Sequence, residues 1–215
     1  MTHEKSIYIL SDKKVKNTIN LPMIDISYIQ QDINFSEYDA IVFTSRNAIK
    51  SLDRFGEDWK NIPSFVIAPE TAKTLKSLGG TVAYVGHSGH GNDFAQEINE
   101  KLHGKKVLYA CGKKVVSNLY DILNNSGVIC HRAVVYETVC KHYEEKIVLP
   151  KNSVIIFSSP STLACFFKNI SDWDESYKAV SIGKTTAQYF PNHIQPFISE
   201  TTSLESCVQK AQELF

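Results

Sequence analysis

The sequence lacks the short motifs that mark several common catalytic mechanisms. Its 215 residues contain no GxSxG nucleophile elbow, no GxxxxGK[ST] phosphate loop, no HExxH pair and no GxGxxG after the first apolar run. Nucleotide-binding and zinc-dependent functions therefore lose most of their support. Any chemistry must be built from less distinctive residues.

An excess of charge of one sign is also missing. Lysine and arginine together number 23, and so do aspartate and glutamate, so no overall field attracts nucleic acid or an anionic membrane. No run approaches the roughly eighteen apolar residues of a transmembrane helix, and the polar residues 1–5 do not resemble an export signal. We therefore expect a cytoplasmic protein that binds neither nucleic acid nor membrane.

Cysteines are few and widely spaced. Their odd number, with neighbours never closer than ten positions apart, predicts neither a disulfide framework nor a metal site and favours a reducing compartment. We interpret Cys111, at the end of a strand-like run, as a small buried apolar residue. His87 and His90 could share a metal ion, but a solvated turn is the favoured interpretation, and we assign them no role. The five cysteines are Cys111, Cys130, Cys140, Cys165 and Cys207.

Short apolar runs of strand length alternate with amphipathic stretches of helix length. This alternation is typical of an α/β fold with parallel sheets. The expected strands lie at 7–10, 40–44, 64–68, 82–85, 107–110, 154–158 and 179–182, and the expected helices at 47–55, 70–78, 93–102, 115–124 and 204–214.

An internal repeat organises these elements. IVFTSRNAI (41–49) aligns with IIFSSPSTL (155–163) at an offset of 114 residues, and VIAPETAKTL (66–75) aligns with VSIGKTTAQY (180–189) at an offset close to 115. VLYACGKKV (107–115) matches IYILSDKKV (7–15), which comes earlier in the chain instead of later. One half of the repeat must therefore take its missing strand from the N-terminus.

The repeat predicts two similar lobes, each a parallel sheet of about five strands flanked by helices. Residues 1–27 and 141–215 form the discontinuous first lobe, and residues 28–140 form the inserted second lobe. The chain then crosses between lobes twice, near 23–29 and 134–139. Both crossings are rich in apolar and β-branched residues, so we expect them to pair as a two-stranded β hinge.

The repeated turns follow the carboxyl ends of strands, where parallel α/β sheets bind ligands. Thr44 and Ser45 end one strand and lead into a helix whose free N–H groups favour carboxylates, and Ser159 occupies the matching turn. Thr71 and Thr186 occupy the second repeated turn. Helix capping by the first set and tight packing by the second set remain open as alternatives.

Lysines follow the same strand ends. Lys13 lies after the first strand and Lys184 opens the turn that contains Thr186. They predict a local anion site, although solvation of a surface is the alternative.

The turns FTSRNAI, APETA, CGKK, VVYET, FSSPS and IGKTTA, in this order, resemble the uroporphyrinogen-III synthase family over nearly the whole chain. The resemblance implies a lyase of haem biosynthesis with two α/β lobes, a two-stranded connection and a substrate cleft. It implies cyclisation of hydroxymethylbilane, a linear tetrapyrrole, to uroporphyrinogen III with inversion of ring D and loss of water. No metal or organic cofactor is implied. A transient hand-over from hydroxymethylbilane synthase is a further hypothesis, and a monomer is the default expectation.

The resemblance also assigns residues. Tyr136 in VVYET matches a family tyrosine and is the catalytic candidate, as a proton donor to the leaving hydroxyl; a hinge tyrosine with a solvated hydroxyl is the alternative. Ala68 departs from the family pattern, which often has glycine there. The predicted substrate-binding residues are Thr44, Ser45, Asn47, Thr71, Gly112, Ser159, Ser161, Thr185, Thr186, Lys13 and Lys184.

Two functions of other classes compete with this one. A non-catalytic bilobal protein that binds a small anionic metabolite would show similar turns. A flavodoxin-like electron carrier is less favoured because the chain has no obvious phosphate loop.

Overall fold

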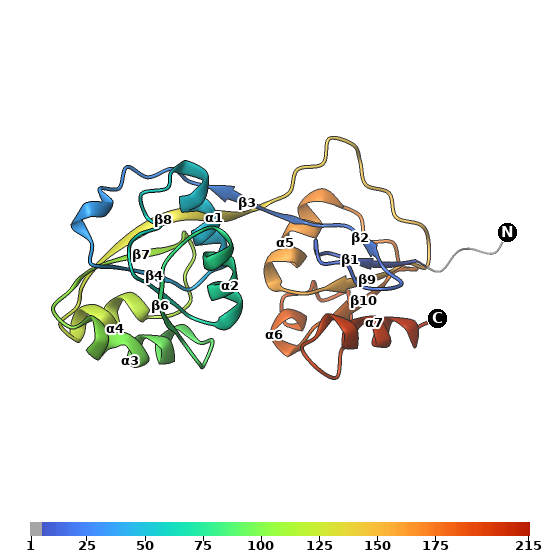
Figure 1. The fold of residues 1–215 in the computed structure, drawn as a ribbon. Helices are drawn as coiled ribbons and strands as arrows, with labels where there is room; N and C mark the ends of the chain where they lie inside the picture. Colours follow the sequence, from blue (N-terminus) through green and yellow to red (C-terminus); the bar gives the residue numbers. More distant parts are fainter. Residues whose placement is uncertain (1–5) are drawn as a thin grey trace. The chain divides into compact units, whose positions relative to one another are not determined.

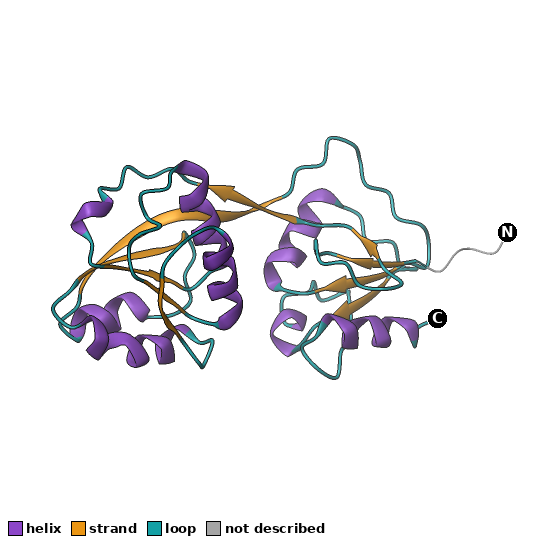
Figure 2. Ribbon diagram, in the orientation of Figure 1, coloured by secondary structure: helices purple, strands orange, loops and turns teal. Residues whose placement is uncertain are grey.

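A computed structural model describes residues 6–215 and divides the chain into two compact units (Figure 1). Unit 1 contains Met1–Asp25 and Val139–Phe215, and unit 2 contains Ile26–Thr138. The chain passes between the units in strands β3 (Ile24–Tyr28) and β8 (Ile129–Cys140), which are hydrogen-bonded neighbours. Each unit has a sheet with helices packed against it (Figure 2).

Unit 2 contains a six-stranded sheet in the order β3-β8-β7-β4-β5-β6. The pairs from β8 through β7, β4 and β5 to β6 are parallel. The remaining elements are η1 (Phe35–Glu37), β4 (Ala40–Phe43), α1 (Arg46–Phe55), β5 (Ser64–Val66), α2 (Pro69–Ser77), β6 (Val82–Val85), α3 (Gly91–Leu102), β7 (Lys106–Gly112) and α4 (Leu119–Asn125).

Alternate residues of these strands enter two different cores, one on each face of the sheet. Ile41 and Phe43 pack with α1 and α2, whereas Ala40 and Val42 pack with α3 and α4. Because both faces are buried, the strands are continuously apolar, as the sequence pattern of a parallel sheet requires. The sheet has six strands because β3 adds to its edge.

Unit 1 contains a five-stranded sheet in the order β11-β10-β9-β1-β2, with every pair parallel. The N-terminal strand β1 therefore lies inside a sheet formed mostly by the C-terminal part of the chain. Helix α5 covers one face and α7 the other. The elements are β1 (Ile7–Ile9), β2 (Ile19–Asn20), β9 (Val154–Phe157), α5 (Pro160–Asn169), β10 (Lys178–Ser181), α6 (Lys184–Ala187), β11 (Phe197–Ile198) and α7 (Leu204–Gln212).

The predicted fold class, parallel sheets flanked by helices, is confirmed. One predicted helix is shorter than expected, because α4 begins at Leu119 and not at residue 115. Val116 in the preceding loop is 94% exposed, so the apolar residues before α4 do not form a buried helical face. No helix among residues 6–215 is both long enough and apolar enough to cross a membrane.

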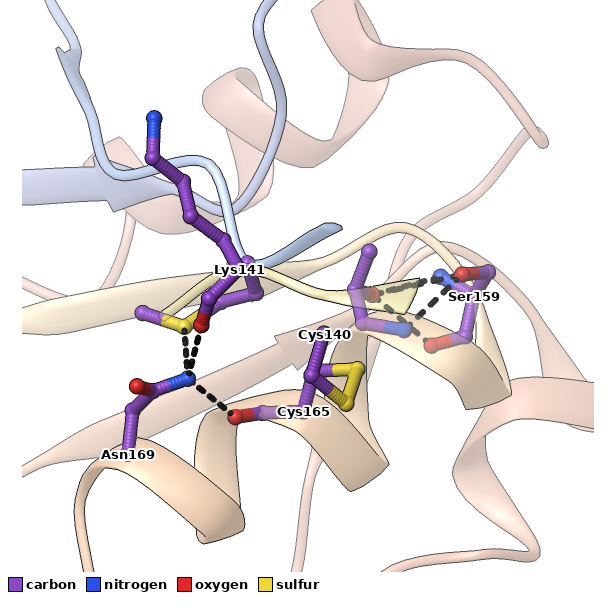
Figure 3. The surroundings of a disulfide bond; sticks show 7 residues. Cys140, Lys141, Ser159, Cys165 and Asn169 are labelled. Atoms are coloured by element: carbon purple, nitrogen blue, oxygen red, sulfur yellow. Dashed lines mark hydrogen bonds between the residues drawn. A yellow bond between two sulfur atoms is a disulfide. The ribbon is translucent and has the colours of Figure 1, made fainter. Parts of the chain in front are cut away.

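The expectation that no disulfide would form is wrong. Cys140, at the end of β8, is bonded to Cys165 on α5, with 5.1 Å between their Cα atoms (Figure 3). Their separation of 25 residues does not reveal this, because helix α5 returns along the sheet to the point where β8 ends. The other cysteines, Cys111, Cys130 and Cys207, are free and buried, so the interpretation of Cys111 as a buried residue is confirmed.

A side-chain amide reinforces the same connection. Asn169 Nδ2 donates hydrogen bonds to the carbonyl oxygens of Lys141, at 3.0 Å, and Cys165, at 2.9 Å (Figure 3). The last residue of β8 is thus held to α5 by the disulfide, and the residue that follows it is held to α5 by the amide of Asn169.

Candidate active site

In unit 2, two predicted site residues lie at the carboxyl end of β4. Ser45 is the N-cap of α1, and its Oγ accepts a hydrogen bond from the backbone N–H of Asn47 at 3.2 Å. The capping alternative therefore describes Ser45 correctly. Thr44 does not cap the helix; its Oγ1 lies 3.1 Å from the phenol oxygen of Tyr109.

In unit 1, the matching turn also has a serine as the N-cap. Ser159 caps α5 and forms a capping box with Thr162, whose backbone N–H donates to Ser159 Oγ at 3.2 Å. Ser161 is exposed in the first turn of the helix. The repeat therefore preserves the capping serine, whereas the accepted N–H comes from the second residue of α1 and from the third residue of α5.

The second pair of repeated turns places two threonines in a less ordinary environment. Thr71 on α2 is 5% exposed and Thr186 on α6 is 3% exposed, yet neither side-chain hydroxyl has a hydrogen-bond partner within residues 6–215. Every fully buried polar side-chain atom in that range does have a partner, so each of these two hydroxyl oxygens keeps some exposure to solvent. Each hydroxyl therefore has a proton that no protein group in that range accepts. Thr185, next to Thr186, is exposed.

Tyr136 and Gly112 lie against each other on neighbouring strands. They are paired in the register of β7 and β8, and the N–H of Lys113 donates to the carbonyl of Tyr136 at 2.9 Å. A Cβ atom added to Gly112 would lie 2.8 Å from Cζ of Tyr136 and 3.0 Å from its phenol oxygen. Gly112 is buried, and the absence of its side chain leaves room for the Tyr136 ring.

The lysines predicted to bind anions have different surroundings. Lys13 lines a depression of 450 Å³ in unit 1, together with Ser11, Ser158 and Thr202. Glu205 lines it as well, so its field is mixed in sign. The other residues that line the depression are Lys14, Val15, Ile182, Ser203 and Leu204. Lys184 is exposed and does not line it.

Ser11 and Thr202 were missed as site residues. Thr202 precedes Ser203, the N-cap of α7, whose Oγ accepts from the N–H of Ser206 at 3.1 Å. A polar pair followed by an apolar helix is the sequence signal of this turn, although it does not mark Thr202 as a site residue. Ser11 gives no such signal, because only the parallel pairing of β1 with β9 brings it beside Ser158.

In the loop after β6, His87, one of the two histidines to which no role is assigned, contacts a carboxylate. Glu97 on α3 accepts hydrogen bonds from the backbone N–H of His87, at 3.1 Å, and from the phenol of Tyr84, at 3.2 Å. His87 Nδ1 lies 3.2 Å from the same carboxylate. No group of three potential metal ligands occurs in the part of the chain that the structure describes.

This loop should respond to acid. Burial would raise the pKa of Glu97, but the hydrogen bonds from His87 and Ser88 outweigh burial and lower this pKa below its ordinary value. The stabilisation is therefore complete above the ordinary pKa of glutamate and is lost as the pH falls through the lowered value.

We expect Glu97→Gln to increase hydrogen exchange at the amides of His87 and Ser88, measured at neutral pH and corrected for intrinsic rates. Glu100→Gln on the same helix is the control, and equal exchange in both variants would contradict the prediction.

The geometry defines a class of protein first: an α/β protein with parallel sheets flanked by helices, whose strand ends carry hydroxyls, helix N-termini and lysines. A family model described as "Uroporphyrinogen-III synthase HemD" matches residues 13–209. The chain belongs to the uroporphyrinogen-III synthase family, which consists of cyclising lyases of haem biosynthesis.

A solved structure agrees with this assignment. The uroporphyrinogen-III synthetase from Helicobacter pylori 26695 is 30% identical, with a TM-score of 0.80, and the match covers 98% of this chain and 100% of that chain. A mutant uroporphyrinogen III synthase from the extremely thermophilic bacterium Thermus thermophilus is also similar, at 12% identity, a TM-score of 0.49 and 98% of each chain covered. A search of the curated proteins gave no match.

Proposed function

We propose that this chain closes hydroxymethylbilane to uroporphyrinogen III, with inversion of ring D and loss of water, and that its strand-end turns hold the substrate carboxylates. One observation carries the assignment of the turns. Thr71 and Thr186, related by the repeat, are both held in nearly buried positions, and both have a hydroxyl without a partner among the described residues. A carboxylate oxygen at each position would accept the hydroxyl proton that the protein leaves unused.

The other predicted residues add binding groups at the strand ends of each unit. Asn47 and the amides that begin α1 lie at the turn that contains Thr44 and Ser45, and the amides that begin α5 lie at the turn of Ser159 and Ser161. Helix N-termini favour negative charge without a metal ion or a strong nucleophile. Lys13 adds a positive charge in the depression that also contains Thr202, and Lys184 and Thr185 are exposed beside Thr186.

Tyr136 supplies the proton in this proposal. The terminal C–O bond of the substrate breaks as the phenol donates its proton to the departing hydroxyl, which leaves as water. The resulting azafulvene is attacked by the substituted carbon of ring D, and the spiro intermediate rearranges to the inverted ring. Because ring closure without inversion occurs spontaneously, the protein contributes chiefly orientation and exclusion of the wrong closure.

The reaction is tested by product analysis. Freshly generated hydroxymethylbilane is given to the purified protein, and the oxidised products are separated into type I and type III uroporphyrin isomers. We expect type III to predominate. Type I alone, formed at the spontaneous rate by demonstrably folded protein, would overturn the proposal and favour a non-catalytic protein that binds a small anionic metabolite.

The two nearly buried threonines give a prediction with a matched control. Thr71→Val and Thr186→Val keep the shape of the side chain and remove the hydroxyl, and a hydrogen bond to a charged group contributes about 1.5 kcal/mol or more. We therefore expect each variant to raise KM for hydroxymethylbilane about tenfold with kcat little changed. Thr74→Val is the control, because the Thr74 hydroxyl donates within α2 to the Glu70 carbonyl. An unchanged KM in both variants would show that neither threonine hydroxyl binds the substrate.

The cellular context proposed for this reaction is a monomer in the cytoplasm that receives hydroxymethylbilane in a transient hand-over from hydroxymethylbilane synthase. Light scattering during size-exclusion chromatography measures the oligomeric state. The hand-over is measured with a competing reaction that consumes free hydroxymethylbilane. The consumed fraction is compared between substrate added free and substrate made by a coupled synthase. Equal fractions in the two experiments would exclude a hand-over.

A further inference from the structure

The hydroxyl of Thr44 is hydrogen-bonded to the buried phenol of Tyr109, which has no role in the proposed reaction. Tyr109 on β7 is 1% exposed and is paired with Val42 in the register of β7 and β4. Its ring belongs to the core between the sheet and helices α3 and α4, while its phenol oxygen reaches Thr44 Oγ1 at 3.1 Å. A buried phenol of this kind needs a hydrogen-bond partner, and Thr44 is one.

This hydrogen bond joins two segments that are far apart in the chain. Tyr109 lies on β7, whereas Thr44 lies in the turn between β4 and α1. The phenol of Tyr109 and the hydroxyl of Thr44 therefore form a row of two hydroxyls that ends at the turn after β4.

The direction of hydrogen bonding along this row determines what Thr44 can offer a ligand. Each hydroxyl has one proton to donate. If Tyr109 donates to Thr44 Oγ1, the Thr44 proton remains available; if Thr44 donates to Tyr109, only lone pairs face the ligand. Burial raises the pKa of Tyr109, which keeps the phenol protonated and able to donate. A carboxylate has only lone pairs to offer, so it favours the first direction and strengthens the row cooperatively.

We propose that Tyr109 is a positioning residue that directs the Thr44 hydroxyl proton toward a carboxylate of the substrate. Tyr109 donates to Thr44, and Thr44 donates to the carboxylate. This inference rests on the proposed function, because it requires Thr44 to contact the tetrapyrrole. It adds a residue from the core of unit 2 that does not itself touch the substrate.

Tyr109→Phe tests the proposal, because it removes the phenol oxygen and keeps the ring in the core. We expect KM for hydroxymethylbilane to rise about fivefold, while kcat and the fraction of type III product stay within about twofold of the parent. Thr44→Val should raise KM by at least as much. The double variant should resemble Thr44→Val alone, because Tyr109 acts only through Thr44.

Tyr177→Phe is the matched control, since the Tyr177 phenol donates to the Leu149 carbonyl at 2.8 Å in unit 1 and its loss should leave KM unchanged. If Tyr109→Phe does not fold, judged by circular dichroism, 3-fluorotyrosine at position 109 replaces it. The more acidic phenol donates more strongly to Thr44, so KM should fall, and an unchanged KM would overturn the proposal.

The outcomes separate this inference from the proposed function. A raised KM in Thr44→Val with an unchanged KM in Tyr109→Phe overturns the role of Tyr109 and leaves the binding role of Thr44 intact. Additive effects of the two substitutions overturn it as well, because Tyr109 would then act independently of Thr44. Type I product alone from the parent protein is the separate result that removes the proposed function itself.

Discussion

Tyr136→Phe is expected to lower kcat for hydroxymethylbilane about 100-fold, with KM within about twofold of the parent value, because a positioned proton donor contributes at least this factor to the rate. The substitution removes only the phenol oxygen from a half-buried side chain. The ring should therefore keep its packing against Gly112 and leave carboxylate binding unaffected. Single-turnover formation of uroporphyrinogen III, corrected for spontaneous type I closure, is the measurement.

Gly112→Ala provides an independent approach to the same tyrosine. Its Cβ would lie 2.8 Å from Cζ of Tyr136, closer than real contacts allow, so the ring must move. We expect kcat to fall as in Tyr136→Phe although the phenol is still present. Gly56→Ala is the matched control, because a Cβ there meets no atom within 4 Å. Full activity in both Tyr136→Phe and Gly112→Ala would show that Tyr136 is not the proton donor.

Reduction of the Cys140–Cys165 disulfide is expected to lower the free energy of unfolding of unit 1 by about 3 kcal/mol, the loop-closure contribution for a bridge spanning a few tens of residues. The bond closes a loop of which residues 141–153 contain no helix or strand, so the reduced, unfolded chain gains most of its freedom there. The amide of Asn169 still joins the Lys141 carbonyl to α5, and the reduced protein should remain folded.

Urea unfolding with and without a phosphine reductant measures this contribution. The control is Cys140→Ser/Cys165→Ser, whose midpoint should match that of the reduced parent and should not respond to the reductant. If the reductant lowers the midpoint of the double variant as much as that of the parent, it acts on a group other than this disulfide. If the reductant does not lower the midpoint of the parent, the disulfide does not stabilise unit 1.

The disulfide and the Gly112–Tyr136 contact show where inference from sequence stopped. Cysteine spacing argued against a bridge, because distance along the chain does not report distance in space once a helix returns along a sheet. Gly112, in the CGKK turn, is among the residues predicted to bind substrate. Its packing beneath Tyr136 depends on the register between β7 and β8, including the irregularity between Cys111 and Gly112, which no local pattern encodes.

The candidate site divides in a similar way. Ser45 and Ser159 were recognisable because an N-cap requires a hydroxyl at a defined step before a helix, and the repeat supplied two examples. Thr71 and Thr186 were recognisable because the repeat places both at a turn where a strand ends and a helix begins. Tyr109 was not, since a tyrosine inside an apolar strand looks like any core residue until β4 places Thr44 beside its phenol.

The sequence by itself determined the alternation of strands and helices, the order of the repeated turns and the hydroxyls at the strand ends. These features depend on burial patterns and caps that act over a few residues. Only the tertiary structure decided that Thr44 meets Tyr109, that Ser11 and Thr202 join Lys13, and that Cys140 meets Cys165. Each of these contacts joins residues far apart in the chain, and its geometry is set by strand register and helix placement, which arise only when the whole sheet is assembled.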